Sequence, residues 1–355
     1  MKIIQIVSTL SFGDAVGNDV LAFQKKLRTM GYQSEIYAEI IDMRMPKGTA
    51  LLVEKLPRLT KEDIVIYHLS TGCAMNYQLE KLGARKILVY HNITPPHYYH
   101  MYSEAAEKLC EEGLKGAKHL AGHVDYCLAV SEFNKQNLID MGYQCSIDVL
   151  PILIPFEDYQ KAPRQETIAR YSDGWTNILF TGRIAPNKKQ EDVIRAFHLY
   201  KKYYNPKSRL ILVGSHTGMD RYYARLKSYV NALDIRDSVI FPGHIKFDEI
   251  LAYYKLADLF LCQSEHEGFC VPLVEAMYFG IPIVAYDSSA ISETLDGCGI
   301  VLKEKNALET AGVMNKVLTD DRIKNELMRR EQRRIEALAY ENVASQLERY
   351  LNKFI

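Results

Sequence analysis

Residues 264–286 read SEHEGFCVPLVEAMYFGIPIVAY and combine two carboxylates with a long apolar run. Glu267 and Glu275 lie eight positions apart, and Glu275 is the one charged residue between Gly268 and Tyr286. A carboxylate buried without a polar partner loses its charge or costs on the order of several kcal/mol. The pattern therefore predicts that Glu275 meets a polar group, either in the protein or in a ligand.

The same stretch indicates its own local structure. Pro272 suits the first turn of a helix, which places Glu275 one turn inside it, and residues 283–286 read as a short buried strand. Backbone amides at such a helix start favour a phosphate. Two purely structural interpretations stay open: Glu267 stabilises the helix dipole, and Glu275 accepts a bond from a nearby backbone amide.

Strand-like apolar runs alternate with helical spacing along the rest of the chain, which predicts an α/β fold with parallel, doubly wound sheets. The runs lie at residues 2–8, 34–40, 64–67, 86–91, 126–130 and 147–150, and then at 177–181, 209–214, 239–241, 259–262, 283–286 and 300–302.

The length of 355 residues points to two domains, since roughly 100–200 residues form one domain. Pro151, Pro155 and Pro163 mark a change of texture between the two series of strands. We expect domains at residues 1–155 and 156–338, followed by an amphipathic final helix at 339–355.

Composition excludes several classes of protein. Lys plus Arg and Asp plus Glu both number 44, so no global field attracts nucleic acid or an anionic membrane. Seven scattered cysteines without a Cys-x-x-Cys pair predict reduced thiols in a cytosolic protein. No apolar run approaches the ~20 residues of a transmembrane helix, and the first run reads as a strand and not as a signal peptide.

A basic loop follows the predicted strand at 177–181. Arg183, Lys188 and Lys189 precede a helix that begins near Gln190. Cations at the carboxyl end of a strand, beside a helix N-terminus, predict an anion site. The alternative is a solvated basic loop.

These motifs together resemble one known family. Glu267, seven intervening residues and Glu275, preceded by GRIAPNK at 182–188 and followed by GIPIVA at 280–285, resemble the donor domain of the family-4 retaining glycosyltransferases. The resemblance is strongest over 182–280 and weaker over nearly all the rest. It implies the GT-B fold, in which two Rossmann-like domains face a cleft and a C-terminal helix crosses back to the first domain.

The resemblance also implies residue roles at the donor site. Arg183 and Lys188 would hold the diphosphate of a nucleotide sugar, Glu275 the ribose hydroxyls, and Glu267 hydroxyls of the transferred sugar. Further donor contacts would come from Gly268, Phe269, Cys270 and Val271 and, near the base, from Gly214, His244 and Ile245.

The first domain offers separate candidates. Gly13 lies where the family has its donor-phosphate glycine loop, but Asp14 replaces the second glycine of that loop. Asp14 either receives an acceptor hydroxyl or caps the following helix. His91 ends a strand and resembles the active-site histidine that faces the transferred sugar. His68 is a second candidate or a plain strand-end histidine.

The segment after His91 carries more aromatic and imidazole groups. Tyr98, for example, either stacks on an acceptor or packs in the protein. His91, His97 and His100 invite a metal interpretation, but their spacing of six and three beside two prolines, without a second ligand cluster, disfavours it. No Asp-x-Asp motif lies near the donor loop, so we expect no metal and no other cofactor.

The resemblance therefore implies a retaining, metal-independent hexosyl- or deoxyhexosyltransferase. Its partners would be a nucleotide diphosphate sugar and a saccharide or lipid-linked saccharide acceptor, with a role in cell-surface polysaccharide or glycolipid assembly. It would be cytoplasmic, and a lipid-linked acceptor would bring it to the inner face of the plasma membrane.

Three alternatives stay open. The first is another GT-B enzyme, either an inverting transferase or a sugar-nucleotide epimerase. The second is a non-catalytic scaffold that binds a sugar nucleotide. The third is a nicotinamide-dependent oxidoreductase, which is disfavoured because no Gly-x-Gly-x-x-Gly follows the first strand.

Overall fold

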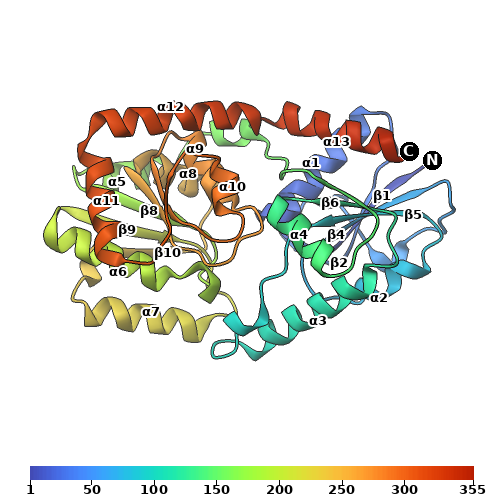
Figure 1. The fold of residues 1–355 in the computed structure, drawn as a ribbon, viewed down its shortest axis with the longest axis horizontal. Helices are drawn as coiled ribbons and strands as arrows, with labels where there is room; N and C mark the ends of the chain where they lie inside the picture. Colours follow the sequence, from blue (N-terminus) through green and yellow to red (C-terminus); the bar gives the residue numbers. More distant parts are fainter. The chain divides into compact units, whose positions relative to one another are not determined.

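The computed structural model describes residues 1–355, which form two units, each built on one parallel β-sheet (Figure 1). Unit 1 comprises Met1–His97, Ala105–Phe156 and Leu338–Ile355, and unit 2 comprises Tyr98–Glu104 and Glu157–Ala337. The seven residues Tyr98–Glu104 thus group with unit 2 although both flanking segments belong to unit 1, an assignment that the sequence did not indicate.

The sheet of unit 1 has seven strands in the order β3-β2-β1-β4-β5-β6-β7. All neighbouring strands pair in parallel, because each connection crosses over one face of the sheet. The strands are β1 (Ile3–Leu10), β2 (Ile36–Ile41), β3 (Leu51–Leu52), β4 (Ile64–Leu69), β5 (Arg85–Tyr90), β6 (Tyr126–Ala129) and β7 (Ser146–Val149).

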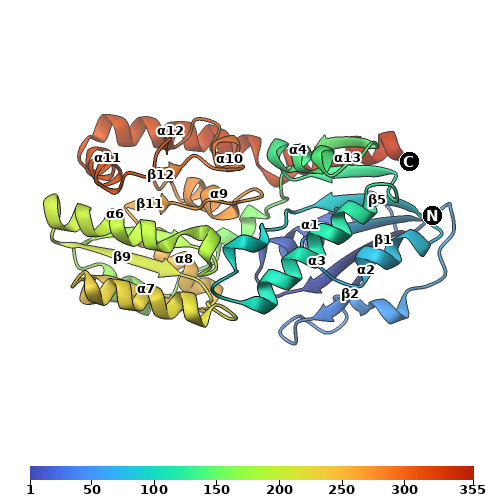
Figure 2. The ribbon, with the colours of Figure 1, turned by 60° about the horizontal axis from the view of Figure 1, so that its bottom comes forward.

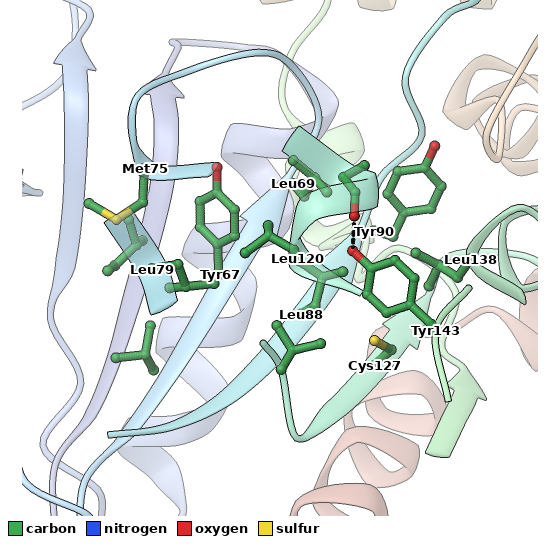
Figure 3. Close-up of a cluster of buried hydrophobic side chains, with 14 of the residues drawn as sticks. Tyr67, Leu69, Met75, Leu79, Leu88, Tyr90, Leu120, Cys127, Leu138 and Tyr143 are labelled. Carbon is green, nitrogen blue, oxygen red and sulfur yellow. Dashed lines mark hydrogen bonds between the residues drawn. The ribbon is translucent and has the colours of Figure 1, made fainter. Parts of the chain in front are cut away.

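Alternating side chains divide the core of unit 1 between the two faces of this sheet. On one face, residues such as Tyr67, Leu88 and Tyr90 pack with side chains of the covering helices, and Figure 3 shows this cluster. Within it the Tyr143 hydroxyl donates to the carbonyl of Ala117 at 2.7 Å, so this polar tip is paired. The helices of unit 1 are α1 (Ala15–Thr29), α2 (Met75–Gln78), α3 (Glu104–Leu120), α4 (Glu132–Asp140) and α13 (Tyr340–Phe354).

The C-terminal helix α13 covers the other face beside α1 (Figure 1). Val343, Leu347 and Leu351 are fully buried there because their spacing puts them on one stripe of the helix. Burying each of these side chains contributes about 1.5–3 kcal/mol. Lys26 of α1 and Glu348 of α13 form an ion pair. These contacts make α13 part of unit 1.

The sheet of unit 2 has six parallel strands in the order β10-β9-β8-β11-β12-β13. Figure 2 shows helices on both sides of it. The strands are β8 (Thr176–Thr181), β9 (Ser208–Val213), β10 (Val239–Gly243), β11 (Leu259–Cys262), β12 (Ile283–Tyr286) and β13 (Ile300–Leu302). The helices are α5 (Gln165–Tyr171), α6 (Gln190–Tyr203), α7 (Asp220–Ala232), α8 (Phe247–Leu256), α9 (Val271–Tyr278), α10 (Ile291–Leu295), α11 (Ala307–Thr319) and α12 (Asp321–Ala337).

The predicted fold class is confirmed: both units are doubly wound parallel α/β structures. The sequence missed β3 because two residues are too short to show a period. Helix α1 starts at Ala15, directly after its cap Asp14.

Both sheets reverse their strand order at one point, between β1 and β4 in unit 1 and between β8 and β11 in unit 2. Ligands of open α/β sheets bind at the carboxyl ends of the strands beside such a reversal. The fold therefore indicates where to look for a site in each unit. None of the helices has both the length and the apolar character that crossing a bilayer requires.

Candidate functional site

Two loops at the strand reversal of unit 2 are bonded to each other. One follows β8 and the other follows β11, and these strands are neighbours in the sheet. The backbone N–H of Glu265 donates to the carbonyl of Asn187 at 2.8 Å, and the Asn187 side-chain amide donates to the carbonyl of His266 at 3.1 Å. These bonds bring the predicted basic loop and the predicted acidic stretch to one place.

An ion pair between Lys188 and Glu267 lies where the loops meet, with 2.5 Å between Nζ and Oε2. The Glu267 side chain is only 7% exposed, and its backbone N–H donates to the Ser289 hydroxyl at 2.8 Å. Burial by itself would lower the pKa of Lys188, but the charge and hydrogen bond of Glu267, together with the nearby thiols of Cys270 and Cys262, leave that pKa raised. Lys188 is therefore charged at neutral pH.

Helix α9 presents its N-terminus beside this pair. Cys270 precedes the helix in a left-handed conformation with φ of 71°, and no side chain caps the first turn. The Thr294 hydroxyl bonds the carbonyl of the buried Phe269 and so fixes the approach to the helix. An uncapped N-terminus carries partial positive charge, so the loop that begins at Gly268 can bind an anion.

Arg183 follows β8 and has an exposed side chain without an ion pair. Its carbonyl accepts a bond from the Gln190 amide at 2.9 Å, which ties the loop to the start of α6. A Cβ on Gly214 would lie 1.8 Å from the carbonyl oxygen of Gly182, so the loops after β8 and β9 approach this closely only because Gly214 lacks a side chain. Because its side chain is exposed and has no ion pair, the guanidinium of Arg183 is available to an anion.

Glu275 stands at the centre of a hydrogen-bonded group of hydroxyls. Tyr254 donates to Oε2 at 2.5 Å and Tyr159 donates to Oε1 at 3.1 Å. Thr181 in turn bonds the Tyr254 hydroxyl at 2.5 Å. Burial raises the pKa of Glu275, while the two tyrosine bonds oppose that rise. The expected polar partner of Glu275 thus exists within the protein, and lone pairs remain for further donors.

The remaining predicted residues of unit 2 lie around the same edge or on its loops. His244 is exposed and Ile245 half-buried in the loop after β10, and Val271 opens α9. Tyr98 packs within unit 2, with its ring centroid 6.3 Å from that of His266. Burial, followed by the charge of Glu265, raises the pKa of the Tyr98 hydroxyl.

Unit 1 has a buried polar cluster at its own strand reversal. His68 Nδ1 lies 3.0 Å from His91 Nε2, and His68 Nε2 lies 3.0 Å from Gln5 Oε1. Asp19 of α1 lies 3.8 Å from His91 Nε2 and accepts a bond from the backbone N–H of Leu153 at 2.7 Å. The structure thus joins the two predicted histidines, but it directs the His91 imidazole inward, where the side chain is 1% exposed.

This cluster is neutral at neutral pH because burial dominates. Burial lowers the pKa of His91 to about 3 and also lowers that of His68. Burial likewise raises the pKa of Asp19 to about 8, and the Leu153 bond opposes it only in part. Without a full opposite charge nearby, each group keeps its uncharged form.

In the glycine loop of unit 1, Asp14 has one of the two roles that the sequence left open, that of a helix cap. The Asp14 side chain accepts the backbone N–H of Gly17 at 2.7 Å, so Asp14 caps α1. Gly13 has φ of 75°, a region that favours glycine. A Cβ on Gly17 would lie 2.5 Å from the Ser11 carbonyl oxygen, so the first turn of α1 packs tightly on this loop.

Sequence reasoning missed four residues that shape these sites: Tyr159, Tyr254, Ser289 and Asp19. The tyrosines and Ser289 come from segments far from the residues they contact, and no local pattern connects them. Asp19 is different, because a carboxylate on the apolar stripe of a predicted helix is a visible signal.

Comparison with known proteins adds a family to this geometry. Residues 169–335 match the family described as Glycosyl transferases group 1. The putative glycosyltransferase YtcC of Bacillus subtilis is 24% identical over 311 residues, which cover 79% of this chain and 76% of that protein. The O-antigen chain mannosyltransferase B of Escherichia coli is 24% identical over 265 residues, which cover 72% of this chain and 66% of that protein.

A solved structure supports the fold over the full length. HepE of Anabaena, determined in complex with UDP-glucose, superposes with a TM-score of 0.77 at 17% sequence identity, covering 99% of this chain and 100% of that one. At this identity the likeness concerns the arrangement of the elements, which is that of two parallel-sheet units.

Proposed function

We propose that this chain, a glycosyltransferase with a group 1 domain over residues 169–335, uses a nucleotide-sugar donor, retains the configuration of the transferred sugar and needs no metal. The observation that carries the proposal is the Lys188–Glu267 ion pair, because it places a cation for phosphate and a carboxylate for sugar hydroxyls side by side.

In the proposal, the diphosphate of the donor binds Arg183, Lys188 and the N-terminus of α9. The exposed guanidinium of Arg183 and the uncapped amides of α9 supply positive charge without a metal ion. Lys188 then exchanges part of its contact with Glu267 for phosphate. Glu267 is thereby freed to accept hydroxyls of the sugar.

Glu275 is assigned to the ribose. The two tyrosine hydroxyls hold its carboxylate in one orientation and leave acceptor positions on both oxygens. In the transfer step, the bond between the anomeric carbon and the diphosphate oxygen breaks while the acceptor oxygen bonds from the same face. The proton of the acceptor hydroxyl passes to the departing phosphate oxygen.

A role in cell-surface polysaccharide or glycolipid assembly is proposed on the relatives. One of them is named for the O antigen chain. The acceptor would then be a saccharide, free or linked to a lipid, and a lipid-linked acceptor would bring the chain to the inner face of the plasma membrane.

The proposal is tested first by a thermal-shift panel of UDP, GDP, ADP, TDP and their sugar conjugates, because a ligand that binds only the folded state raises its stability. We expect one nucleotide family to raise the unfolding temperature and NAD to leave it unchanged. Stabilisation by NAD alone would contradict the proposed donor.

Calorimetry of the Arg183→Ala variant with the selected diphosphate tests the site. We expect binding to weaken by about 2–4 kcal/mol, since a desolvated charge contact is lost. The control is Arg236→Ala, which removes an exposed arginine of the same unit. Equal affinities of the two variants would show that Arg183 lies outside the donor site. Proton NMR of the product decides the anomeric configuration, and an inverted linkage would refute retention.

A further inference from the structure

Three clusters of side chains in this protein bring three metal-ligand atoms within 4.8 Å of one another. Two of them are occupied by other interactions. In the cluster of Cys262, Glu267 and Cys270, the carboxylate already pairs with the ammonium of Lys188, whose charge would repel a metal ion. That cluster therefore remains part of the charged site of unit 2.

The second cluster is that of Asp19, His68 and His91. The ring centroids of the two histidines lie 5.3 Å apart and their nitrogens 3.0 Å apart, with the planes 25° from parallel. The centroids are farther apart than the nitrogens by the sum of the two centroid-to-nitrogen distances within the rings. Both nitrogens therefore lie on the line that joins the two ring centroids. This is a head-on N–H···N hydrogen bond. A shared cation would need the lone pairs to converge on a point off that line.

The third cluster consists of Glu80, His119 and His123, and its atoms do converge. Nε2 of His119 lies 3.0 Å from Oε2 of Glu80, and Nε2 of His123 lies 3.2 Å from the same oxygen. The two imidazoles come from positions four apart at the end of α3, and their ring centroids lie 4.9 Å apart. No lysine or arginine pairs with this carboxylate.

The position of the third cluster also favours a cation. His119 lies in the last turn of α3 and His123 lies just beyond its end, where the negative end of the helix dipole attracts positive charge. Glu80 belongs to the turn Leu79–Lys81, which follows α2. The three side chains are 29–41% exposed, so an ion can reach them from solvent.

We propose that Glu80, His119 and His123 form a Zn²⁺ site in unit 1 that joins the end of α3 to the turn Leu79–Lys81. Two imidazole nitrogens and one carboxylate oxygen are a ligand set that suits zinc, with water completing a tetrahedral arrangement. The ion stabilises unit 1 and has no part in the transfer reaction, because α3 covers the face of the sheet opposite to the face of His68 and His91.

The test is isothermal titration calorimetry of the full chain with ZnCl₂ at pH 7.5, combined with thermal unfolding before and after chelation by EDTA. We expect one ion per chain and an unfolding temperature that rises with zinc and falls again with EDTA. His123→Ala should weaken zinc binding by about 10–100-fold or more. Mutation of a residue that only hydrogen-bonds a metal ligand already has an effect of this size, and loss of the ligand itself should have at least the same effect.

Matched variants make the outcome decisive. His216→Ala removes a histidine that lies 3.7 Å from the carboxylate of Asp220, four positions away. This pair has no third ligand beside it, so the variant should leave zinc binding unchanged. Glu80→Gln keeps the shape of the side chain and serves as the second variant if His123→Ala fails to fold. Absence of binding, or binding that neither variant weakens, overturns the proposal and leaves an adventitious ion only.

Discussion

The strand reversals of the two units have the same topology but opposite electrostatic character. In unit 1 the reversal holds Gln5, His68, His91 and Asp19, all buried and neutral at neutral pH. In unit 2 it holds Lys188 and Glu267 as an ion pair, with the exposed Arg183 nearby. The fold provides the same position twice, and the side chains decide whether that position carries charge.

The two sites differ because only unit 2 supplies a counter-charge to its buried charged group. Lys188 keeps its charge because Glu267 and the nearby thiols together overcome the effect of burial on its pKa. Asp19 and His91 lie 3.8 Å apart but have no such counter-charge, because burial holds each of them in its uncharged form. Unit 2 therefore offers charged groups to a ligand, whereas unit 1 offers neutral hydrogen-bonding groups.

The largest effect is expected from Glu267→Gln, which removes the charge from the site of unit 2. Turnover should fall about 10²–10³-fold, because the proposed function gives Glu267 a charged contact to the reacting sugar that would be lost in the transition state. Initial rates with the donor selected by the thermal-shift panel measure this. The matched control is Glu265→Gln, which breaks ion pairs to Lys189 and Lys305 on the same loop. Equal losses in both variants would mean that only the loop had been disturbed.

Glu275→Ala should destabilise unit 2 by about 2–4 kcal/mol, because it leaves the hydroxyls of Tyr159 and Tyr254 without their acceptor. Glu275→Gln should cost less, since its amide oxygen still accepts a bond. Differential scanning calorimetry gives both values. Glu304→Ala, at an exposed position, should stay within about 0.5 kcal/mol of the unsubstituted protein. If Glu275→Ala lowered the free energy of unfolding by no more than Glu304→Ala does, Glu275 would not be the acceptor on which the hydroxyls of Tyr159 and Tyr254 depend.

Asp19→Asn tests whether the carboxyl group of Asp19 is protonated in the folded protein, through the dependence of stability on pH. Because the folded pKa of Asp19 is raised from 3.8 to about 8, the folded state binds more protons than the unfolded state between these values, and stability falls as pH rises. The unsubstituted protein should lose about 2 kcal/mol relative to this variant between pH 6 and pH 8. Calorimetric scans at pH 6, 7 and 8 measure the difference.

The same scans sharpen the contrast with unit 2. The raised pKa of Lys188 means that its contribution to stability is fully present below its ordinary value of 10.5 and is lost only as pH rises through the folded value. Lys188→Met should therefore shift stability by a constant amount from pH 6 to pH 8. A pH-independent difference for Asp19→Asn would show that Asp19 is charged in the folded protein.

The smallest effect is expected from Asp14→Ala, which removes the cap of α1 and should cost about 1 kcal/mol. Ser131→Ala, at the cap of α4 in the same unit, is the comparison and should cost a similar amount. If Asp14 only caps, neither variant changes the KM for the acceptor. A rise in that KM for Asp14→Ala alone would assign Asp14 to acceptor binding.

The sequence by itself determined the fold class and most strands. β11, β12 and β13 begin and end where their apolar runs do, because a buried parallel strand must be apolar on both faces. It also indicated that Arg183, Lys188, Glu267 and Glu275 belong together, since the family resemblance spans both loops. The spacing His119-x-x-x-His123 at a helix end was a visible signal as well, but it acquires meaning only beside Glu80.

Only the tertiary structure decided which groups are charged and what they contact. The bond from Tyr254 to Glu275 and the position of Asp19 beside His91 join segments that are distant in the chain. Burial fixes the protonation of His91 and Asp19, and burial depends on every element packed around them. The residue types set the chemistry that is available, whereas packing sets the distances and the dielectric environment in which it operates.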